Sequence, residues 1–219
     1  MSNFDRSQKE FWSENANLRA YDHPIVESFA RQRVNFLRGL FDSPIRDCLE
    51  VGCGDGFGMY YMQEFGRVFG CDISRPMLAR NPLRPSVSEA DIYRLPYADK
   101  SFDLVYCWEV LHHVADVESA IREMARVSRK YILIFEPNSF NPPMFVFGLV
   151  GPSEIGLLRF TPWYLRSQFR RAGLKNFSTM TVGTFTPNRT PAWLHKILIR
   201  LPYRMPIVGI SNLAFGKVD

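Results

Sequence analysis

A short run of glycines stands where a turn could bring the backbone against a ligand. The run Glu50-Val51-Gly52-Cys53-Gly54-Asp55-Gly56 ends a predicted buried strand over residues 45–51 and precedes a predicted helix over residues 57–65. Glycine adopts positive φ without strain and lets a ligand approach the backbone closely. In an open parallel sheet, the turn after the first strand usually meets the cofactor. The run therefore indicates a nucleotide site, although a tight structural turn would use the same glycines.

An acidic residue follows at the spacing that ribose recognition requires. Asp72 comes twenty residues after Gly52, at the end of the next predicted strand, residues 67–71. A carboxylate at this place can accept hydrogen bonds from ribose hydroxyls. A nicotinamide oxidoreductase has the same acid at similar spacing, so these two features leave the nucleotide open.

Three further details favour an adenosyl group attached to an amino acid. Phe57 stands where the dinucleotide fingerprint has its sixth-position glycine or alanine, which disfavours a pyrophosphate on the helix N-terminus. Glu50 precedes the turn, where a carboxylate would repel a diphosphate but attract an ammonium group. Asp91 and Ile92 end the third predicted strand and could hold the amine and the ring face of adenine.

From about Cys48 to Pro137 the sequence resembles the class I S-adenosylmethionine-dependent methyltransferases, especially the small-molecule branch that includes quinone-biosynthesis enzymes. The motifs are Cys-Leu-Glu-Val-Gly-Cys-Gly-Asp-Gly, Gly-Cys-Asp-Ile-Ser, the segment from Glu-Ala-Asp-Ile-Tyr to Ser-Phe-Asp-Leu-Val, and Glu-Val-Leu-His-His-Val. Residues 159–173 resemble the family's late helix more weakly. The resemblance implies S-adenosylmethionine as cofactor and S-adenosylhomocysteine as product. It places the methionine moiety at Gly52, Cys53, Gly54 and the backbone of Cys107, the ribose at Asp72, and the adenine at Ile73, Met77, Asp91 and Ile92.

Two adjacent histidines are candidates for a catalytic role. His112 and His113 follow the fourth predicted strand, and a neutral imidazole there could deprotonate or orient a hydroxyl of the methyl acceptor. Methyl transfer from a sulfonium can also proceed by positioning and exclusion of water alone. A structural role at the start of a helix therefore remains equally open for both. Glu109 is predicted to be solvated or to contribute to packing.

Strands alternate with helices through most of the chain, which predicts parallel pairing with helices on both faces. We expect an α/β, Rossmann-like, doubly wound sheet of seven strands, mostly parallel with an antiparallel last strand. The predicted strands cover residues 45–51, 67–71, 86–91, 103–107, 131–135, 175–184 and 209–218, and further helices cover 74–80 and 116–128.

Residues 1–219 form one expected domain, with an N-terminal helical lid (1–41, including Trp12 and Tyr21), a cofactor-binding core (42–137) and acceptor-side elements (138–219). Asn141-Pro142-Pro143 is interpreted as a marker of an irregular insertion over residues 140–159.

The cysteines do not have the spacing of a metal site. Cys48, Cys53, Cys71 and Cys107 form no CxxC pair and have no histidine partners at zinc-finger distances. All four fall within or beside apolar predicted strands. We therefore predict reduced, buried thiols in an intracellular protein and no metal ion.

The charge is distributed unevenly. Residues 1–158 hold 17 Lys and Arg against 21 Asp and Glu, whereas residues 159–219 hold ten Lys and Arg against Asp219 alone. Within this cationic part, residues 192–201 combine an apolar stripe with basic side chains, which suits either an anionic membrane surface or packing on the domain itself. The charge and the apolar run at residues 144–150 favour an amphiphilic or anionic acceptor.

The predicted function is methyl transfer from S-adenosylmethionine to a small or amphiphilic acceptor such as a lipid, a lipid-linked glycan or a quinone-type precursor. Two alternatives are a nucleic-acid methyltransferase and a non-catalytic S-adenosylmethionine-binding protein. Nucleic acid is not expected as a partner, because the basic residues are not interleaved with stacking aromatic side chains. The polar residues 1–14 do not resemble a signal peptide, and residues 144–150 are too few to cross a bilayer. A cytoplasmic protein is expected, with peripheral membrane contact left open.

Overall fold

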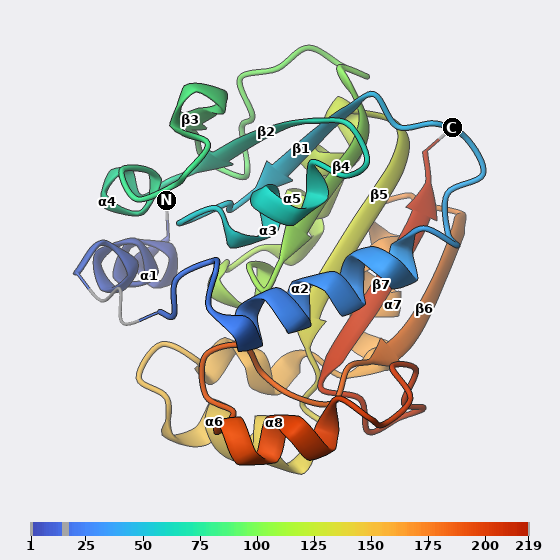
Figure 1. Cartoon of the computed structure of the whole chain (residues 1–219). Coiled ribbons are helices and arrows are strands. Elements are labelled where there is room, and N and C mark those ends of the chain that lie inside the picture. The colour runs from blue at the N-terminus through green and yellow to red at the C-terminus, as the bar shows by residue number, and fades with distance from the viewer. Residues whose placement is uncertain (1, 15–17, 219) are drawn as a thin grey trace.

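The computed structural model describes residues 2–14 and 18–218, and its centre is one seven-stranded sheet (Figure 1). The strand order is β3-β2-β1-β4-β5-β7-β6. Strands β1 to β5 are parallel, and β7 runs antiparallel to both of its neighbours, β5 and β6. The strands are β1 (Asp47–Val51), β2 (Arg67–Asp72), β3 (Val87–Glu89), β4 (Phe102–Trp108), β5 (Ser128–Pro137), β6 (Asn176–Val182) and β7 (Ser211–Lys217). The predicted fold class is confirmed, including the antiparallel last strand.

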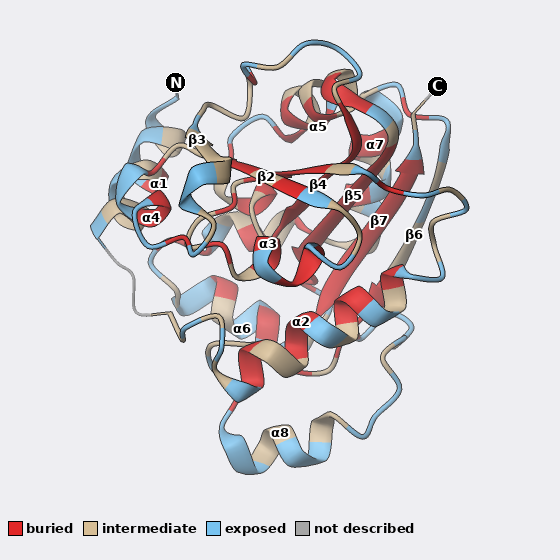
Figure 2. Ribbon diagram, turned by 45° about the horizontal axis from the view of Figure 1, so that its top comes forward, coloured by how far each residue is buried: buried red, intermediate tan, exposed pale blue. Residues whose placement is uncertain are grey.

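Both faces of the central strands are apolar because helices cover the sheet on two sides. In β4, Leu104 and Tyr106 belong to the core beneath α2 (Pro24–Leu37) and α3 (Phe57–Met62). Val105, between them, points to the opposite core beneath α5 (Val117–Val127) and α7 (Pro162–Arg171). Successive side chains of a strand point to opposite faces, so a strand covered twice has a continuous apolar sequence. Figure 2 shows the resulting buried band through the middle of the molecule.

Polar residues begin most of the helices. The side chains of five N-cap residues accept a backbone N–H of the following turn: His23 for α2, Ser74 for α4 (Arg75–Leu78), Asp116 for α5, Asn141 for α6 (Pro142–Val150) and Thr161 for α7. Such caps satisfy N–H groups that have no partner within the helix. Proline stands in the first turn of four of these helices, where its missing N–H costs no hydrogen bond.

The segment predicted as irregular is largely helical, so that prediction is wrong. Asn141 caps α6 instead of marking a loop, and a 3₁₀ helix follows at Ile155–Arg159. Proline pairs were interpreted as turn residues, yet the same residues are favoured in the first turn of a helix. Further 3₁₀ turns cover Arg84–Ser86 and Leu111–His113.

The remaining helices cover one end of the molecule. The first helix, α1 (Asn3–Glu14), lies against α4 and the 3₁₀ turn at Leu111–His113. Helix α8 (Ala192–Leu198) lies with α6 at the bottom of Figure 1, at the end of the sheet where the parallel strand β5 finishes. Among the described residues, no helix is both long and apolar enough to cross a membrane.

Candidate functional site

A cavity of about 670 Å³ opens at the carboxyl ends of β1, β2 and β4. Its lining includes Val51, Asp72 and Trp108, which stand at or near the ends of these strands. This is where ligands bind in open parallel sheets, and the volume lies within the range of roughly 300–1,000 Å³ for small-molecule sites. Of the residues predicted to bind cofactor or acceptor, all but Cys107 line it: Glu50, Gly52, Cys53, Gly54, Asp72, Ile73, Met77, Asp91, Ile92, His112 and His113.

The glycine turn after β1 forms one wall of this cavity. Gly52 has φ of 73°, and a Cβ at this position would lie 2.6 Å from the side chain of Val110. Gly54 also has positive φ, at 47°. Because the turn needs left-handed backbone and has no room for a side chain at position 52, its glycines are required by geometry.

Asp72 is fixed by the backbone at the end of β2. Its Oδ2 accepts the N–H of Gly54 at 2.9 Å and its Oδ1 accepts that of Ser74 at 2.8 Å. Burial raises the pKa of Asp72, against the effect of these hydrogen bonds. Each carboxylate oxygen can accept more than one hydrogen bond, so Asp72 still has lone pairs for ribose hydroxyls. These free acceptor positions fit the hydroxyls of the ribose of an adenosyl cofactor.

The predicted adenine residues lie in the loop after β3. This strand ends at Glu89, so Asp91 and Ile92 stand in a turn and not on the predicted strand. Asp91 Oδ1 accepts the N–H of Tyr93 at 3.0 Å. Both residues line the cavity with Ile73 and Met77, which follow β2. The position agrees with an adenine site, whereas the contacts to adenine stay a prediction.

Glu50 and the four cysteines are more deeply buried than a ligand-binding role alone requires. Glu50 is 2% exposed, and its Oε2 accepts the hydroxyl of Tyr106 at 2.9 Å. Burial raises the pKa of Glu50 to about 8. Burial also raises the pKa of all four thiols, and all are free. Cys107 faces the core beneath α5, because it stands two residues after Val105 on β4 and therefore on the same face.

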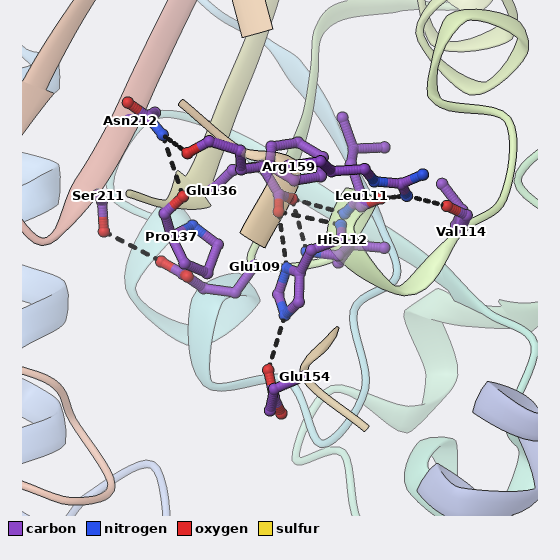
Figure 3. Close-up of polar contacts among 12 residues, drawn as sticks. Glu109, Leu111, His112, Val114, Glu136, Pro137, Glu154, Arg159, Ser211 and Asn212 are labelled. Carbon is purple, nitrogen blue, oxygen red and sulfur yellow. Dashed lines mark hydrogen bonds and ion pairs between the residues drawn. The ribbon is translucent and has the colours of Figure 1, made fainter. Parts of the chain in front are cut away.

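His112 is clamped between two carboxylates (Figure 3). Its Nδ1 lies 2.7 Å from Glu136 Oε2, and its Nε2 lies 3.2 Å from Glu154 Oε2. Burial alone would lower the pKa of His112, but the two carboxylates outweigh it and raise the pKa to about 10. A protonated imidazole cannot accept a proton, so this geometry supports the structural role and not the general base.

The partners of His112 join two parts of the chain. Glu136, at the end of β5, also accepts the backbone N–H of Val110 at 2.8 Å. Glu154 belongs to the insertion before the 3₁₀ helix Ile155–Arg159. Candidate ligand atoms of His112, His113 and Glu154 lie within 4.8 Å of one another. Since both ring nitrogens of His112 already face carboxylates, we assign no metal ion to this cluster.

His113 has a different environment from its neighbour. Burial, together with the charge of His112, lowers the pKa of His113 well below its usual value. Its Nδ1 is buried and has no hydrogen-bond partner, and its ring meets that of Trp12 edge to face at 5.1 Å between centroids. Trp12 lines the cavity from α1, whereas Tyr21 packs against Tyr60. A neutral imidazole at the cavity wall keeps His113 as a candidate for contact with the acceptor.

A buried arginine was not found by the sequence analysis. Arg33 is 1% exposed, and its guanidinium lies 4.1 Å from the ring centroid of Phe29 and 4.2 Å from that of Phe135. It pairs with Glu109 and donates to the hydroxyl of Ser211 at 2.9 Å. Glu109 is thus held by the charge of Arg33 instead of being merely solvated. Its backbone φ is 61°. Positive φ at a residue with a side chain is strained and often marks a functional position.

Comparisons with known proteins show similarity to methyltransferases. Residues 49–133 match a family model described as a methyltransferase domain. The chain is 26% identical to 27-O-demethylrifamycin SV methyltransferase of Amycolatopsis mediterranei, over 84% of the chain and 74% of that protein. It is 34% identical to a ubiquinone biosynthesis O-methyltransferase of Hahella chejuensis, over 56% of each chain. For five further curated relatives, the match spans 36–48% of the relative's length.

A solved structure shows the same fold along the whole chain. It is described as an S-adenosylmethionine-dependent methyltransferase, possible histamine N-methyltransferase, of Thermotoga maritima. Its TM-score is 0.69 at 17% identity, and the superposition covers 99% of this chain and 98% of the other. At this identity the likeness concerns the fold, while the matched family model covers the glycine turn, Asp72 and Asp91.

Proposed function

Because the chain belongs to the class I S-adenosylmethionine-dependent methyltransferases, we propose that it transfers a methyl group to a small amphiphilic acceptor. Acceptors of this class are a lipid, a lipid-linked glycan or a quinone-type precursor. The two methyltransferases of Amycolatopsis and Hahella have names that specify small-molecule acceptors, which supports the same class for this chain.

One observation carries the proposal: a single cavity joins the cofactor residues to an apolar compartment. Beyond the glycine turn, its walls come from Phe29 of α2, Trp108 of β4, and Met144 and Phe147 of α6. The polar side chains of Glu109 and Ser211 also line it. An apolar wall with few polar groups suits an acceptor that has a hydrocarbon part and one polar end.

The chain's own residues would act by positioning. S-adenosylmethionine supplies the methyl group on a sulfonium, which is already an electrophile. Gly52, Gly54 and Asp72 would hold the cofactor, and the apolar walls would exclude water from the reacting atoms. Glu109 and the neutral His113 could accept a hydrogen bond from the acceptor.

Methyl transfer from label-carrying S-adenosylmethionine to fractionated cell extract tests the proposal. We expect label in the organic phase of a lipid extract and not in RNA, DNA or the aqueous metabolites. Replacing Phe147 by alanine removes cavity wall and should reduce lipid labelling by about tenfold, from roughly 1–2 kcal/mol of lost apolar contact. The affinity for S-adenosylhomocysteine should remain that of the wild type.

Other outcomes of this experiment would support the alternatives. Label in RNA or DNA would indicate a nucleic-acid methyltransferase. Binding of S-adenosylhomocysteine without label in any fraction would indicate a non-catalytic binding protein. Label restricted to small uncharged acceptors would contradict the amphiphilic class while leaving methyl transfer intact.

A further inference from the structure

Exposed apolar side chains gather at one end of the molecule. Apart from Tyr60, every exposed large apolar residue of the described chain falls between residues 140 and 208. We define the apolar rim as those on α6, on α8 and at the two positions 207 and 208 before β7: Phe145, Val146, Leu149, Val150, Trp193, Ile197, Ile207 and Val208. Helices α6 and α8 occupy the same end of the molecule, and exposed residues mark both (Figures 1 and 2). We propose that the apolar rim docks on an anionic lipid membrane, an inference that rests on the proposed function.

One hydrogen bond and one shared buried cluster connect the three parts of the rim. Asn141, which caps α6, donates from Nδ2 to the carbonyl of Val208 at 2.8 Å. Phe147 of α6 and Leu198 of α8 pack against the same buried cluster, which includes Phe185. Exposed apolar side chains gathered on neighbouring segments in this way are uncommon on proteins without an interaction partner.

Helix α6 separates the cavity from this surface. It has no charged or polar side chain between Pro142 and Val150. Met144 and Phe147 line the cavity, whereas Val146 and Val150 on the same helix are 55% and 72% exposed. Helices that are apolar on all sides occur in protein cores or in membranes, and α6 is only partly covered by protein. Membrane contact would cover its outer side and bring lipid to the wall of the cavity.

The charge around the rim favours anionic lipid over other occupants. Residues 159–218 contain ten Lys and Arg and no Asp or Glu. Lys196 and Arg200 lie exposed on and just after α8, and Arg204 is exposed between α8 and the rim positions 207 and 208. The guanidinium of Arg189 lies 4.2 Å from the ring centroid of Phe147. Basic side chains beside exposed Trp, Phe and Leu are typical of interfacial membrane binding. Two copies joined through this face would bring like charges together, which disfavours a homodimer.

Vesicle sedimentation tests the surface without requiring catalysis. The full chain should sediment with vesicles that contain phosphatidylglycerol and bind about tenfold less to pure phosphatidylcholine or at high salt. The variants Phe145→Ser/Leu149→Ser and Lys196→Glu/Arg200→Glu should each weaken binding by about tenfold or more. Tyr60→Ser and Arg84→Glu are the matched controls, because these exposed residues lie outside the rim. Both controls should bind as the wild type does.

Three results would overturn the docking surface. These are no sedimentation with anionic vesicles, equal binding to both vesicle types, or equal losses in rim and control variants. The protein could instead self-associate in sedimentation velocity without binding vesicles. If the Phe145→Ser/Leu149→Ser variant abolished that self-association, the rim would be assigned to a second copy of the chain.

Methyl transfer to detergent-dispersed lipid separates the two proposals. Vesicle binding without labelled lipid would contradict the proposed function and leave docking intact, and labelled lipid without vesicle binding would do the reverse.

Discussion

We call the part of the cavity at the glycine turn and Asp72 the cofactor end, and the part at Glu109 and Ser211 the acceptor end. The contacts that hold these two ends join residues at different distances along the chain. At the cofactor end, Asp72 is held by Gly54 and Ser74, which lie 18 and 2 residues away in the chain. At the acceptor end, Arg33 binds Glu109 and Ser211 across 76 and 178 residues. Residues joined by local contacts lie in one short stretch of sequence. Residues joined by distant contacts come from separate elements, and these elements must all keep their relative positions. The acceptor end is therefore more sensitive to changes outside the cavity.

The largest effect should follow from replacing His112, which lines the cavity and bridges Glu136 of β5 and Glu154. Replacing His112 by alanine leaves Glu136 and Glu154 buried without their cation, and breaking a buried ion pair costs about 3–5 kcal/mol of unfolding free energy. Urea unfolding at neutral pH measures this loss. His195→Ala is the matched control, since His195 is only partly buried and bonds Ser28 at 3.0 Å. Equal losses of unfolding free energy in the two variants would contradict the role of His112 in joining Glu136 and Glu154.

The ion pairs of His112 also predict how the difference in unfolding free energy between wild type and His112→Ala changes with pH. The pKa of His112 is raised to about 10 from an ordinary 6.5, so its stabilising charge is fully present below 6.5. The stabilisation is then lost as the pH rises toward 10. We expect the difference in unfolding free energy between wild type and His112→Ala to narrow between pH 7 and 10. A constant difference would show that His112 contributes packing rather than charge.

A smaller and more selective loss should follow from Asp72→Ala. Hydrogen bonds to a charged group contribute about 1.5–3 kcal/mol, so the affinity for S-adenosylhomocysteine should fall roughly 100-fold in calorimetry. Vesicle binding should not change, because Asp72 lines the cavity and is not one of the exposed rim residues. Asp99→Ala removes an exposed carboxylate that pairs with Arg126 and should leave cofactor affinity intact. Loss of vesicle binding in Asp72→Ala would break the division between the two ends.

The same division explains what the sequence could predict. Asp72 and Asp91 both line the cavity, because their distance from the glycine turn depends only on strand and loop lengths, while their contacts with the cofactor stay a prediction. The alternation of helices and strands likewise predicted the seven-stranded sheet. Strand β3 is shorter than predicted, since an edge strand that pairs only with β2 ends where that pairing ends.

Residues that act through distant partners were missed. Glu136 stands near the end of an apolar strand, where a buried carboxylate needs hydrogen-bond donors. This position was the only feature of the nearby sequence that indicated a buried polar site. Its partner His112 was found, but not the clamp that sets its charge. Arg33 appeared to be one more basic residue on an amphipathic helix, because nothing near it in sequence indicates Glu109 or Ser211. Cys107 is absent from the cavity lining and its side chain lies in the core, so the predicted contact of its backbone with the methionine moiety stays a prediction.

The smallest expected effect concerns Glu50 and sharpens the description of the cofactor end. Burial raises the pKa of Glu50 to about 8 against an ordinary 4.5, so the folded protein holds a proton there that the unfolded chain releases. Stability therefore falls as the pH rises from 4.5 to about 8, and Glu50→Gln should lack this part of the pH dependence. Cofactor binding should have the opposite trend, because only the carboxylate attracts an ammonium group. Calorimetry should show the affinity of the wild type for S-adenosylhomocysteine rising several-fold, by about 1 kcal/mol, between pH 6.5 and 8.5, while Glu50→Gln stays constant. If both proteins bind with the same pH dependence, Glu50 supports the glycine turn through Tyr106 and does not bind the ammonium group.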